Sequence, residues 1–364
     1  MRPEERPLIV GPLPPPVGGI ATIVAKLAEF PGVRQGIQFL DTSKAADESG
    51  LGRLMRPARL LFELNRRLRQ RPKCALVFCS AHGSFWEKGM WLLLAHRRGV
   101  PMIVMMVAGT FPEFYQGLRA PIRRLVRWLL ERFDLVIVQT ESWRRFYSGI
   151  GPGGNYIVLP NGVDCHEFTP SGREHSGPAT VLFVGWLIPE KGVFDLVDAA
   201  RILSERGAGF RLRLVGPFHG NEPALRSRVA AVGLGEVVQL VGPLHSRREI
   251  LEAYHDADIF TLPSWAEGLP VAVLEAMACG LPIVASDVGG TPDLVQHEVC
   301  GLLVPARNPA ALADALERLV RDRNARLRFG QAARARVESA FSNEVFIAGV
   351  LSLLKPPRGD EGTA

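Results

Sequence analysis

The stretch from Asp258 to Pro292 decides the fold, and it reads DIFTLPSWAEGLPVAVLEAMACGLPIVASDVGGTP. It contains an apolar strand, a loop with Pro and Gly, a helix, a second strand and another Gly-rich loop. Pro270 suits the first position of the helix, because its missing N–H would have no partner there. Gly280 followed by Pro282 is a typical helix stop. The pattern predicts a β–α–β unit whose first loop opens directly into the N-terminus of a helix.

The first loop and the helix after it have the features of a site for a phosphorylated, hydroxyl-rich ligand. The first amides of the helix, from Val271 to Val273, are expected to be free, at the end of the helix that suits a phosphate. Glu267 in the loop and Glu275 in the helix are good acceptors for hydroxyl hydrogens, as an acidic residue is for ribose in dinucleotide sites. The ligand would be a nucleotide, a sugar, or both joined. An ordinary βαβ unit with two solvated glutamates explains the spacing equally well.

The composition is that of a globular protein. The chain has 364 residues, enough for two domains, of which 47% are hydrophobic and 22% charged. The first residues lack the apolar run of a signal peptide, and the longest apolar runs, such as Pro101–Ala108, are far too short to span a bilayer. The five cysteines are scattered without the pairing of metal sites. We therefore expect a cytoplasmic protein.

The basic charge lies in the first half of the chain. Residues 1–170 hold 23 Lys and Arg against 14 Asp and Glu, and residues 171–364 hold 20 against 23, which gives +9 and −3 and the net charge of +6. Two basic amphipathic helices are predicted, over residues 51–72 and 118–133. Such helices can lie on an anionic membrane surface, so peripheral contact with the inner face of the cell membrane is one expectation. Ordinary helices with a solvated arginine face are the other.

Strands and helices alternate in both halves, which predicts an α/β protein with two doubly wound, Rossmann-like domains facing a cleft. The N-terminal domain is expected over residues 1–170 and the second domain over residues 171–341, after the polar segment Ser171–Pro178. Residues 342–364 would form a helix that could pack back on the N-terminal domain, and a tail. In the first domain, Gly18 and Gly19 precede a helix and Gly109 follows a strand, and at both places the backbone could approach a ligand. A Pro-rich connecting loop without a ligand explains the Gly18-Gly19 segment equally well.

The sequence resembles a known family, the retaining glycosyltransferases of family 4 with the GT-B fold. Five motifs in the right order carry the resemblance, and they are Pro160-Asn161-Gly162-Val163-Asp164 with Phe168 and Pro170, Phe183-Val184-Gly185-Trp186 through Pro189-Glu190-Lys191-Gly192, Pro263-Ser264-x-x-Glu267-Gly268 with Glu275, Gly289-Gly290-x-Pro292-Asp293, and Gly301-Leu302-Leu303-Val304-Pro305. Any one of them alone is weak. The resemblance covers most of the chain and implies transfer of a sugar from a UDP- or GDP-sugar to a glycan or lipid-linked acceptor, as in polysaccharide or glycoconjugate synthesis. It implies no metal, no other cofactor and no nucleic acid.

The resemblance also implies roles for the two domains and for individual residues. Residues 1–170 would bind the acceptor, and residues 171–341 would bind the nucleotide sugar. Glu267 would contact hydroxyls of the donor sugar, Glu275 the ribose of the nucleotide, and Lys191 the diphosphate. Charge develops on the leaving diphosphate, so a cation and a helix N-terminus aimed at it lower the barrier. Further donor-binding positions, mostly backbone groups, are Gly268, Leu269, Val271, Gly18, Gly19 and Gly109.

Two positions depart from the family pattern. Trp186 stands where an Arg usually follows the Phe-Val-Gly strand, and Ala108 stands where a His often precedes Gly109. These departures favour an alternative, a catalytically weak or inactive relative that binds nucleotide sugar as a partner subunit. A glycosidase is disfavoured, because its two acids must flank one glycosidic bond. Glu267 and Glu275 are instead expected in a loop and a helix beside a phosphate site. The D-x-D triplet at Asp256–Asp258 is not read as a metal motif, because it ends a helix and precedes a strand.

Overall fold

The structure of this chain, a computed structural model, describes residues 6–13, 19–30, 33–43, 50–107, 109–172 and 177–354. It divides into two compact units. Unit 1 is Met1–Pro160 together with Phe346–Ala364, and unit 2 is Asn161–Val345. The break after Pro160 lies upstream of the polar segment at Ser171–Pro178. Both units are α/β structures with a parallel sheet and a hydrophobic core of their own, which confirms the predicted fold class.

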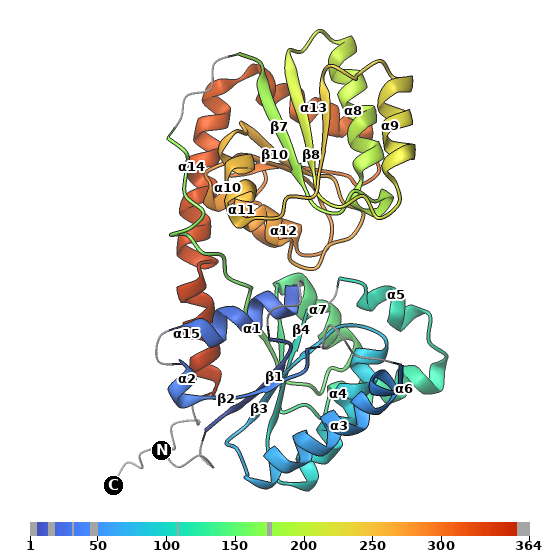
Figure 1. Ribbon diagram of the computed structural model, residues 1–364, viewed down its shortest axis with the longest axis vertical. Coiled ribbons are helices and arrows are strands. Elements are labelled where there is room, and N and C mark those ends of the chain that lie inside the picture. The colour runs from blue at the N-terminus through green and yellow to red at the C-terminus, as the bar shows by residue number, and fades with distance from the viewer. Residues whose placement is uncertain are drawn as a thin grey trace. The chain divides into compact units, whose positions relative to one another are not determined.

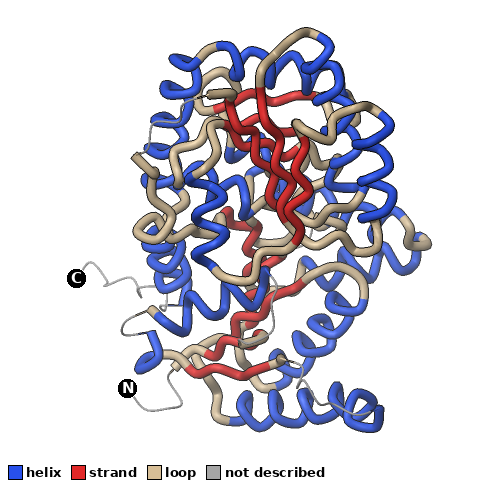
Figure 2. The backbone as a smooth tube through the Cα atoms, turned by 45° about the horizontal axis from the view of Figure 1, so that its top comes forward, coloured by secondary structure: helices blue, strands red, loops and turns tan. Residues whose placement is uncertain are grey.

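Unit 1 is built on a six-stranded parallel sheet with the order β2-β1-β3-β4-β5-β6. Its strands are β1 (Leu8–Gly11), β2 (Gln38–Asp41), β3 (Ala75–Cys79), β4 (Met102–Met106), β5 (Leu135–Val138) and β6 (Tyr156–Val158). The three strands β1, β3 and β4 are buried along their whole length. Helices cover both faces of a parallel sheet, and this is why these strands are almost continuous apolar runs (Figure 2).

The helices of unit 1 form two layers. They are α1 (Gly19–Glu29), α2 (Val33–Gly36), α3 (Gly50–Arg69), α4 (Gly83–Arg97), α5 (Phe111–Gln116), α6 (Ala120–Leu130), α7 (Glu141–Ile150) and α15 (Asn343–Leu354). Figure 1 shows α1 and α15 on one face of the sheet and α3, α4 and α6 on the other. Although α15 follows unit 2 in the sequence, its Phe346, Ile347 and Val350 are buried in the same cluster as Val24 and Leu27 of α1. The C-terminal helix is therefore part of the core of unit 1.

Unit 2 has a second six-stranded parallel sheet, with the order β12-β11-β10-β7-β8-β9. Its strands are β7 (Ala179–Val184), β8 (Phe210–Val215), β9 (Val238–Gly242), β10 (Ile259–Leu262), β11 (Ile283–Ser286) and β12 (Gly301–Val304). The chain runs outward from β7 to β9, returns to the other side of β7 at β10, and runs outward again to β12. The strand order therefore reverses between β7 and β10, the place where open α/β sheets bind their ligands.

The helices of unit 2 cover both faces of this sheet. They are the 3₁₀ turn η2 (Pro189–Lys191) and α8 (Val193–Glu205), α9 (Glu222–Ala231), α10 (Arg247–His255), α11 (Val271–Ala278), α12 (Thr291–Leu294), α13 (Pro309–Arg321) and α14 (Arg323–Ala340). Figure 1 shows α8, α9 and α13 on one face and α10, α11 and α14 on the other. Helix α10 begins with a capping box, in which Ser246 and Glu249 satisfy each other's backbone amides.

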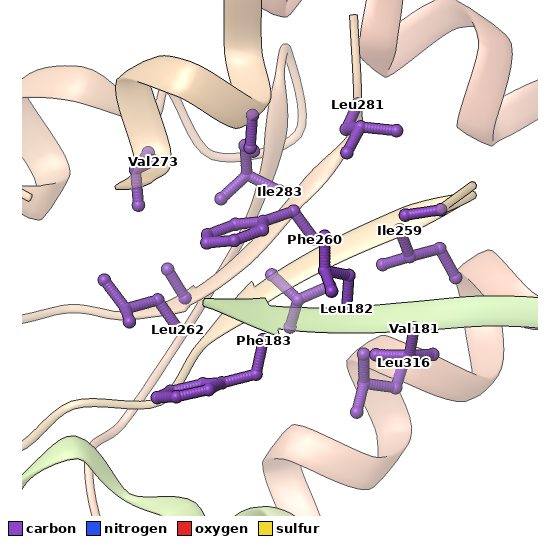
Figure 3. Close-up of a cluster of buried hydrophobic side chains, with 14 of the residues drawn as sticks. Val181, Leu182, Phe183, Ile259, Phe260, Leu262, Val273, Leu281, Ile283 and Leu316 are labelled. Atoms are coloured by element: carbon purple, nitrogen blue, oxygen red, sulfur yellow. The ribbon is translucent and has the colours of Figure 1, made fainter. Parts of the chain in front are cut away.

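The core of unit 2 fixes the ends of the strands that carry the candidate site. Figure 3 shows Phe183 of β7, Phe260 and Leu262 of β10 and Val273 of α11 among the buried side chains of this core. Phe183, Phe260 and Val273 have no solvent exposure. Interiors packed in this way resist displacement of single side chains, so the loops that follow β7 and β10 start from rigid positions.

No helix in the described ranges has the length and apolar character needed to cross a bilayer.

Candidate active site

Two loops meet at the point where the strand order of unit 2 reverses. One loop follows β7 and leads through η2 to Gly192, and the other follows β10 and spans Pro263–Pro270. A Cβ atom on Gly192 would lie only 2.0 Å from the carbonyl oxygen of Pro263, and Gly192 has φ 70°. The backbone N–H of Trp265 donates to the carbonyl of Glu190 at 2.9 Å. Glycine is therefore required at position 192 for two reasons, the left-handed backbone and the close approach of the second loop.

Glu267 and Lys191 form an ion pair where these loops touch. Lys191 Nζ lies 2.6 Å from Glu267 Oε1, and the Ser264 hydroxyl donates to the same oxygen at 2.6 Å. The Glu267 side chain is 9% exposed and that of Lys191 27%. A buried carboxylate needs such partners, because its desolvation is costly. Sequence reasoning selected both charged residues, but it did not predict that they bind each other.

A third loop holds the backbone of Glu267 in place. Gly289, in the loop after β11, has φ 53°, and a Cβ atom there would lie 1.8 Å from the carbonyl oxygen of Glu267. The Gly-Gly pair of the fourth motif therefore allows one loop to pass directly over the next. The loop of Glu267 is thus held between the loops that follow β7 and β11.

Trp265 anchors the other side of the same loop. Its indole Nε1–H donates to Asp195 Oδ2 of α8 at 2.7 Å, and the Arg307 guanidinium lies 4.2 Å from the centre of its ring. Both contacts cross from one element to another, so they restrict the position of the loop between β10 and α11. No pattern in the sequence indicated Asp195 or Arg307 as supports of the site.

Glu275 lies in the second turn of α11 and is oriented by a buried tyrosine. The Tyr254 hydroxyl, from α10, donates to Glu275 Oε2 at 2.9 Å. Tyr254 has no solvent exposure, and its ring packs against Phe168 and Phe260. Burial raises the pKa of the Tyr254 phenol well above its ordinary value, and the charge of Glu275 adds to this rise. The phenol therefore stays protonated and remains a hydrogen-bond donor to the carboxylate.

The N-terminus of α11 differs from the expectation in two respects. Pro270 is the residue before the helix and not its first residue, and the N–H of Val273 donates to the Pro270 carbonyl at 3.1 Å. The prediction that the Val273 amide is free is therefore wrong, because the first turn closes back on Pro270. Of the other predicted positions, Leu269 is buried in the core, Gly268 is half-buried in the loop, and Val271 is the first residue of α11.

Trp186 is exposed beside this site. It follows the end of β7, has 56% of its surface exposed, and lies with its ring 4.8 Å from that of His219. His219 has a positive φ of 47° in the turn after β8. The indole of Trp186 is uncharged, so it cannot supply the positive charge of the arginine that is usual in the family at this position.

The predicted positions of unit 1 follow two different strands of its sheet, β1 and β4. Gly19 is the first residue of α1, and Gly109 lies in the turn between β4 and α5. Gly18 and Ala108 lie outside the described residues. The roles of Gly18, Gly19 and Gly109 stay predictions.

The D-x-D triplet has a structural role. Asp258 Oδ2 accepts the backbone N–H of Thr180 at 2.8 Å, at the amino ends of β7 and β10 and so opposite to Glu267. Within the described ranges, no three His, Cys, Asp or Glu side chains lie close enough together to hold a metal ion. His255 Nε2 lies 2.7 Å from the carbonyl of Thr169 and thus joins two segments of unit 2.

Two family models match almost the whole chain. Residues 18–162 match the glycosyl transferase 4-like domain, and residues 166–336 match the glycosyl transferases group 1 domain. The second match contains Lys191, Glu267 and Glu275.

Several bacterial proteins named as glycosyltransferases or mannosyltransferases are similar in sequence. The chain is 32% identical over 236 residues to the amylovoran biosynthesis glycosyltransferase AmsK of Erwinia amylovora, over 62% of this chain and 57% of that protein. It is 36% identical over 286 residues to the D-inositol 3-phosphate glycosyltransferase of Pseudarthrobacter chlorophenolicus, and the match covers 71% of this chain and 66% of that protein. It is 32% identical over 288 residues to the GDP-mannose-dependent alpha-(1-6)-phosphatidylinositol monomannoside mannosyltransferase of Mycobacterium tuberculosis. This match covers 74% of this chain and 73% of that protein. The match with AmsK thus covers less than two thirds of that protein.

Solved structures share the fold. Sucrose-phosphate synthase of Thermosynechococcus elongatus has a TM-score of 0.78 and 20% identity, over 96% of this chain and 98% of that one. Anabaena HepE in complex with UDP has a TM-score of 0.78 and 20% identity, over 96% and 99%. At this identity the likeness shows the architecture alone. It agrees with the two parallel sheets described above and with the GT-B assignment.

Proposed function

The chain belongs to the glycosyl transferases group 1 family, and we propose that it moves a sugar from a UDP- or GDP-sugar to a glycan or lipid-linked acceptor, with retention of the anomeric configuration. The observation that carries this proposal is the contact between Lys191 and Glu267 at the reversal of strand order in unit 2. A cation and an acceptor of hydroxyl hydrogens lie there side by side, which is the combination that a sugar diphosphate needs.

Lys191 would neutralise the diphosphate of the donor. Its ammonium has three hydrogen-bond donors, so it can contact a phosphate oxygen while it keeps a bond to Glu267. As the bond between the sugar and the diphosphate breaks, negative charge grows on the leaving group. A cation fixed beforehand lowers the barrier without reorganisation, and the pairing with Glu267 supports such fixation.

The two glutamates would hold the two hydroxyl-rich parts of the donor. Glu267 would accept from hydroxyls of the transferred sugar, with Ser264 and Lys191 holding its carboxylate. Glu275 would accept from the ribose, and the Tyr254 phenol, a permanent donor, would keep its carboxylate oriented. The amides of Gly268, Leu269 and Val271 would add contacts to the phosphates or the sugar. No metal or other cofactor is part of this proposal.

The relatives suggest the class of acceptor. AmsK is named for the synthesis of a polysaccharide, and the mycobacterial relative is named for a mannosyl transfer onto a phosphatidylinositol monomannoside. We infer that unit 1 holds a growing glycan or a glycolipid, at the cytoplasmic side of a membrane. The alternative of a catalytically weak or inactive donor-binding relative rests on Trp186 and Ala108. The paired Lys191 and Glu267 speak against it.

Nucleotide titration of matched variants tests the proposal. UDP and GDP are titrated by calorimetry into the wild type, Glu275→Ala and the control Glu252→Ala, which removes an exposed carboxylate on α10 that pairs with Arg248. We expect one nucleotide to bind, with about tenfold loss in Glu275→Ala and no change in the control. Equal binding by all three proteins would refute the assignment of Glu275. Release of nucleotide from UDP- and GDP-sugars, with and without acceptor glycans, decides between the transferase and the inactive relative.

A further inference from the structure

Large hydrophobic side chains are exposed mainly on three helices of unit 1. Among the described residues twelve large hydrophobic side chains are exposed, and eight of them lie on α3, α4 and α6. They are Met55, Leu61 and Phe62 of α3, Met90 and Leu93 of α4, and Ile122, Leu125 and Trp128 of α6. Phe62 is 72% exposed and Trp128 36%. Single exposed apolar residues are normal, whereas a concentration on neighbouring elements marks an interaction surface.

The three helices lie side by side, so these side chains share one surface, here called the α3–α4–α6 face. Arg98 Nη2, just after α4, donates to Asn65 Oδ1 of α3 at 2.9 Å. A Cβ atom on Gly89 of α4 would lie 2.9 Å from Leu129 Cδ1 of α6, so these two helices touch as well. Figure 1 shows the three helices next to each other on one side of the sheet.

Helices α3 and α4 have a second stripe beyond the one that packs on the sheet, and in α6 the first part of the apolar stripe is itself exposed. In α6, Val126, Leu129 and Leu130 are buried, while Ile122 and Leu125, one turn before Val126 and Leu129, are exposed. In α4 the exposed residues Met90, Leu93 and Arg97 follow the i, i+3, i+7 spacing of one helix face. The exposed stripe of α3 has the same helical spacing, with apolar and basic residues mixed, and it consists of Met55, Arg59, Phe62, Arg66 and Arg69.

The charge around this face is strongly positive. Residues 51–132 hold sixteen Lys and Arg against four Asp and Glu, a net charge of +12 in a chain whose total is +6. Three of the four acids already pair with cations of the same region: Glu63 with Arg66 and Arg67, Glu87 with Lys88, and Glu131 with Arg127. The Arg132 guanidinium lies 3.9 Å from the centre of the Trp128 ring, so basic and aromatic groups are in direct contact.

A basic hollow lies where two of the stripes end. It has a volume of about 410 Å³ and is lined by Leu68, Arg69, Arg71, Arg97, Arg98 and Gly99, without an acidic residue among the described residues. Arg69 ends the exposed stripe of α3, and Arg97 ends that of α4. Four arginines around a hollow can bind a phosphate group through charge-assisted, bidentate hydrogen bonds.

We propose that the α3–α4–α6 face docks on a membrane surface that contains anionic phospholipids. The apolar side chains enter the boundary between headgroups and acyl chains, and the surrounding arginines, including those of the hollow, contact lipid phosphates. Both parts are needed, because the apolar stripes alone would suit a protein partner and the charge alone a soluble anion. None of these residues belongs to the proposed donor site in unit 2, so loss of docking and loss of sugar transfer are separate results.

Vesicle co-sedimentation of the full chain tests this proposal. The vesicles are phosphatidylcholine alone or with about one third phosphatidylglycerol, in about 0.1 M salt. We expect binding to the anionic vesicles, weaker binding as salt is raised, and little binding to the neutral ones. Phe62→Ser with Leu125→Ser removes two insertion points, and Arg59→Gln with Arg124→Gln removes two exposed charges. Each pair should weaken binding about tenfold.

The control is Leu327→Ser, which removes a leucine of unit 2 with 52% exposure, close to the 46% of Leu125. It should bind vesicles like the wild type, and all variants should keep the wild-type melting temperature. Quenching of Trp fluorescence by brominated lipid should be lost in Trp128→Phe. Equal binding to neutral vesicles, no binding to anionic ones, or unchanged binding in both pairs of variants would overturn the proposal. A dimer of the wild type in solution that Phe62→Ser dissociates would instead assign the face to self-association.

Discussion

At the scale of single residues, one ion pair governs the candidate site. Lys191 and Glu267 lie 76 positions apart in the sequence, and their side chains meet at 2.6 Å with Glu267 almost buried. The pair links the loops that follow β7 and β10, and in the proposed function it holds a cation beside the diphosphate of the donor. Removal of the lysine therefore affects both the stability of unit 2 and the proposed chemistry.

Lys191→Ala should slow transfer much more than it weakens donor binding. The variant loses the charge that opposes the leaving diphosphate, and we expect kcat to fall about 100-fold. It also leaves a nearly buried carboxylate with one partner fewer, which should cost about 1–3 kcal/mol of stability. Steady-state kinetics, nucleotide titration and thermal unfolding measure the three quantities. Lys191→Arg, which keeps the charge, should retain more activity, and equal loss in both variants would contradict the electrostatic role.

Trp186→Arg should strengthen nucleotide diphosphate binding. The residue is exposed, so the change should alter stability by no more than about 0.5 kcal/mol. A new charge-assisted hydrogen bond to the diphosphate would be worth about 1.5–3 kcal/mol, or about tenfold or more in affinity. Calorimetric titration with UDP and GDP measures the effect. Trp186→Gln, a polar side chain without charge, is the control. No gain for the arginine over the glutamine would mean that position 186 does not face the diphosphate.

At the scale of elements, glycines decide how closely the loops of the site approach each other. Gly192 and Gly207 stand at the two ends of α8 and have almost the same backbone, with φ 70° and 68°. A Cβ atom on Gly192 would clash with the carbonyl of Pro263, whereas around Gly207 nothing lies within 4 Å. The two positions therefore separate the cost of the left-handed backbone from the cost of the crowded contact.

Gly192→Ala should destabilise unit 2 more than Gly207→Ala does. Both variants should lose about 1–2 kcal/mol from the left-handed backbone. The Gly192 variant should lose about 1–3 kcal/mol more, because the loop of Pro263 must move. Denaturant unfolding measures the difference, and donor titration shows whether the displaced loop also weakens binding. Equal stability of the two variants would mean that the contact between the loops is easily relaxed.

Sequence reasoning succeeded for elements with strong apolar patterns and failed where the pattern was weak. The strands β7 and β10 and the helix α11 follow from apolar runs, Pro270 and Gly280. Helix α9 was not predicted, because only Leu225 and Val229 of it are buried, which leaves a weak apolar pattern. The bound amide of Val273 was not predicted either, because it depends on how tightly the first turn closes on Pro270.

At the scale of the whole molecule, the C-terminal helix returns to unit 1. Phe346 and Ile347 of α15 are 2% exposed, in the cluster that contains β1 and α1. The stability of unit 1 therefore depends on a segment that follows unit 2 in the sequence. Without α15, the face of the unit 1 sheet on which α1 packs would be only partly buried.

Phe346→Ala should destabilise unit 1 by about 3–5 kcal/mol, because it leaves a large cavity in the core. The neighbouring Val345 is 40% exposed, so Val345→Ala should change stability by no more than about 0.5 kcal/mol. Hydrogen exchange of the strands of unit 1 measures the loss and distinguishes it from changes in unit 2. Equal protection of β1 and β3 in both variants would show that α15 does not contribute to this core.

The sequence by itself determined the class of the fold and the place of the basic charge, and it selected the residues of the candidate site. Apolar runs, helix stops and loop glycines are local signals, and they were enough to predict two α/β halves. Glu267 and Glu275 were selected by their places in a loop and the helix after it, and Lys191 was selected only by the resemblance to the family.

Only the tertiary structure decided which of these residues meet. Strand order depends on packing between distant segments, and the neighbouring positions of β7 and β10 bring Lys191 to Glu267. The contact of Tyr254 with Glu275 and the exposed apolar stripes of α3, α4 and α6 have the same origin. A helical pattern tells which side chains share a face. Whether another element covers that face is settled only when the whole chain has packed.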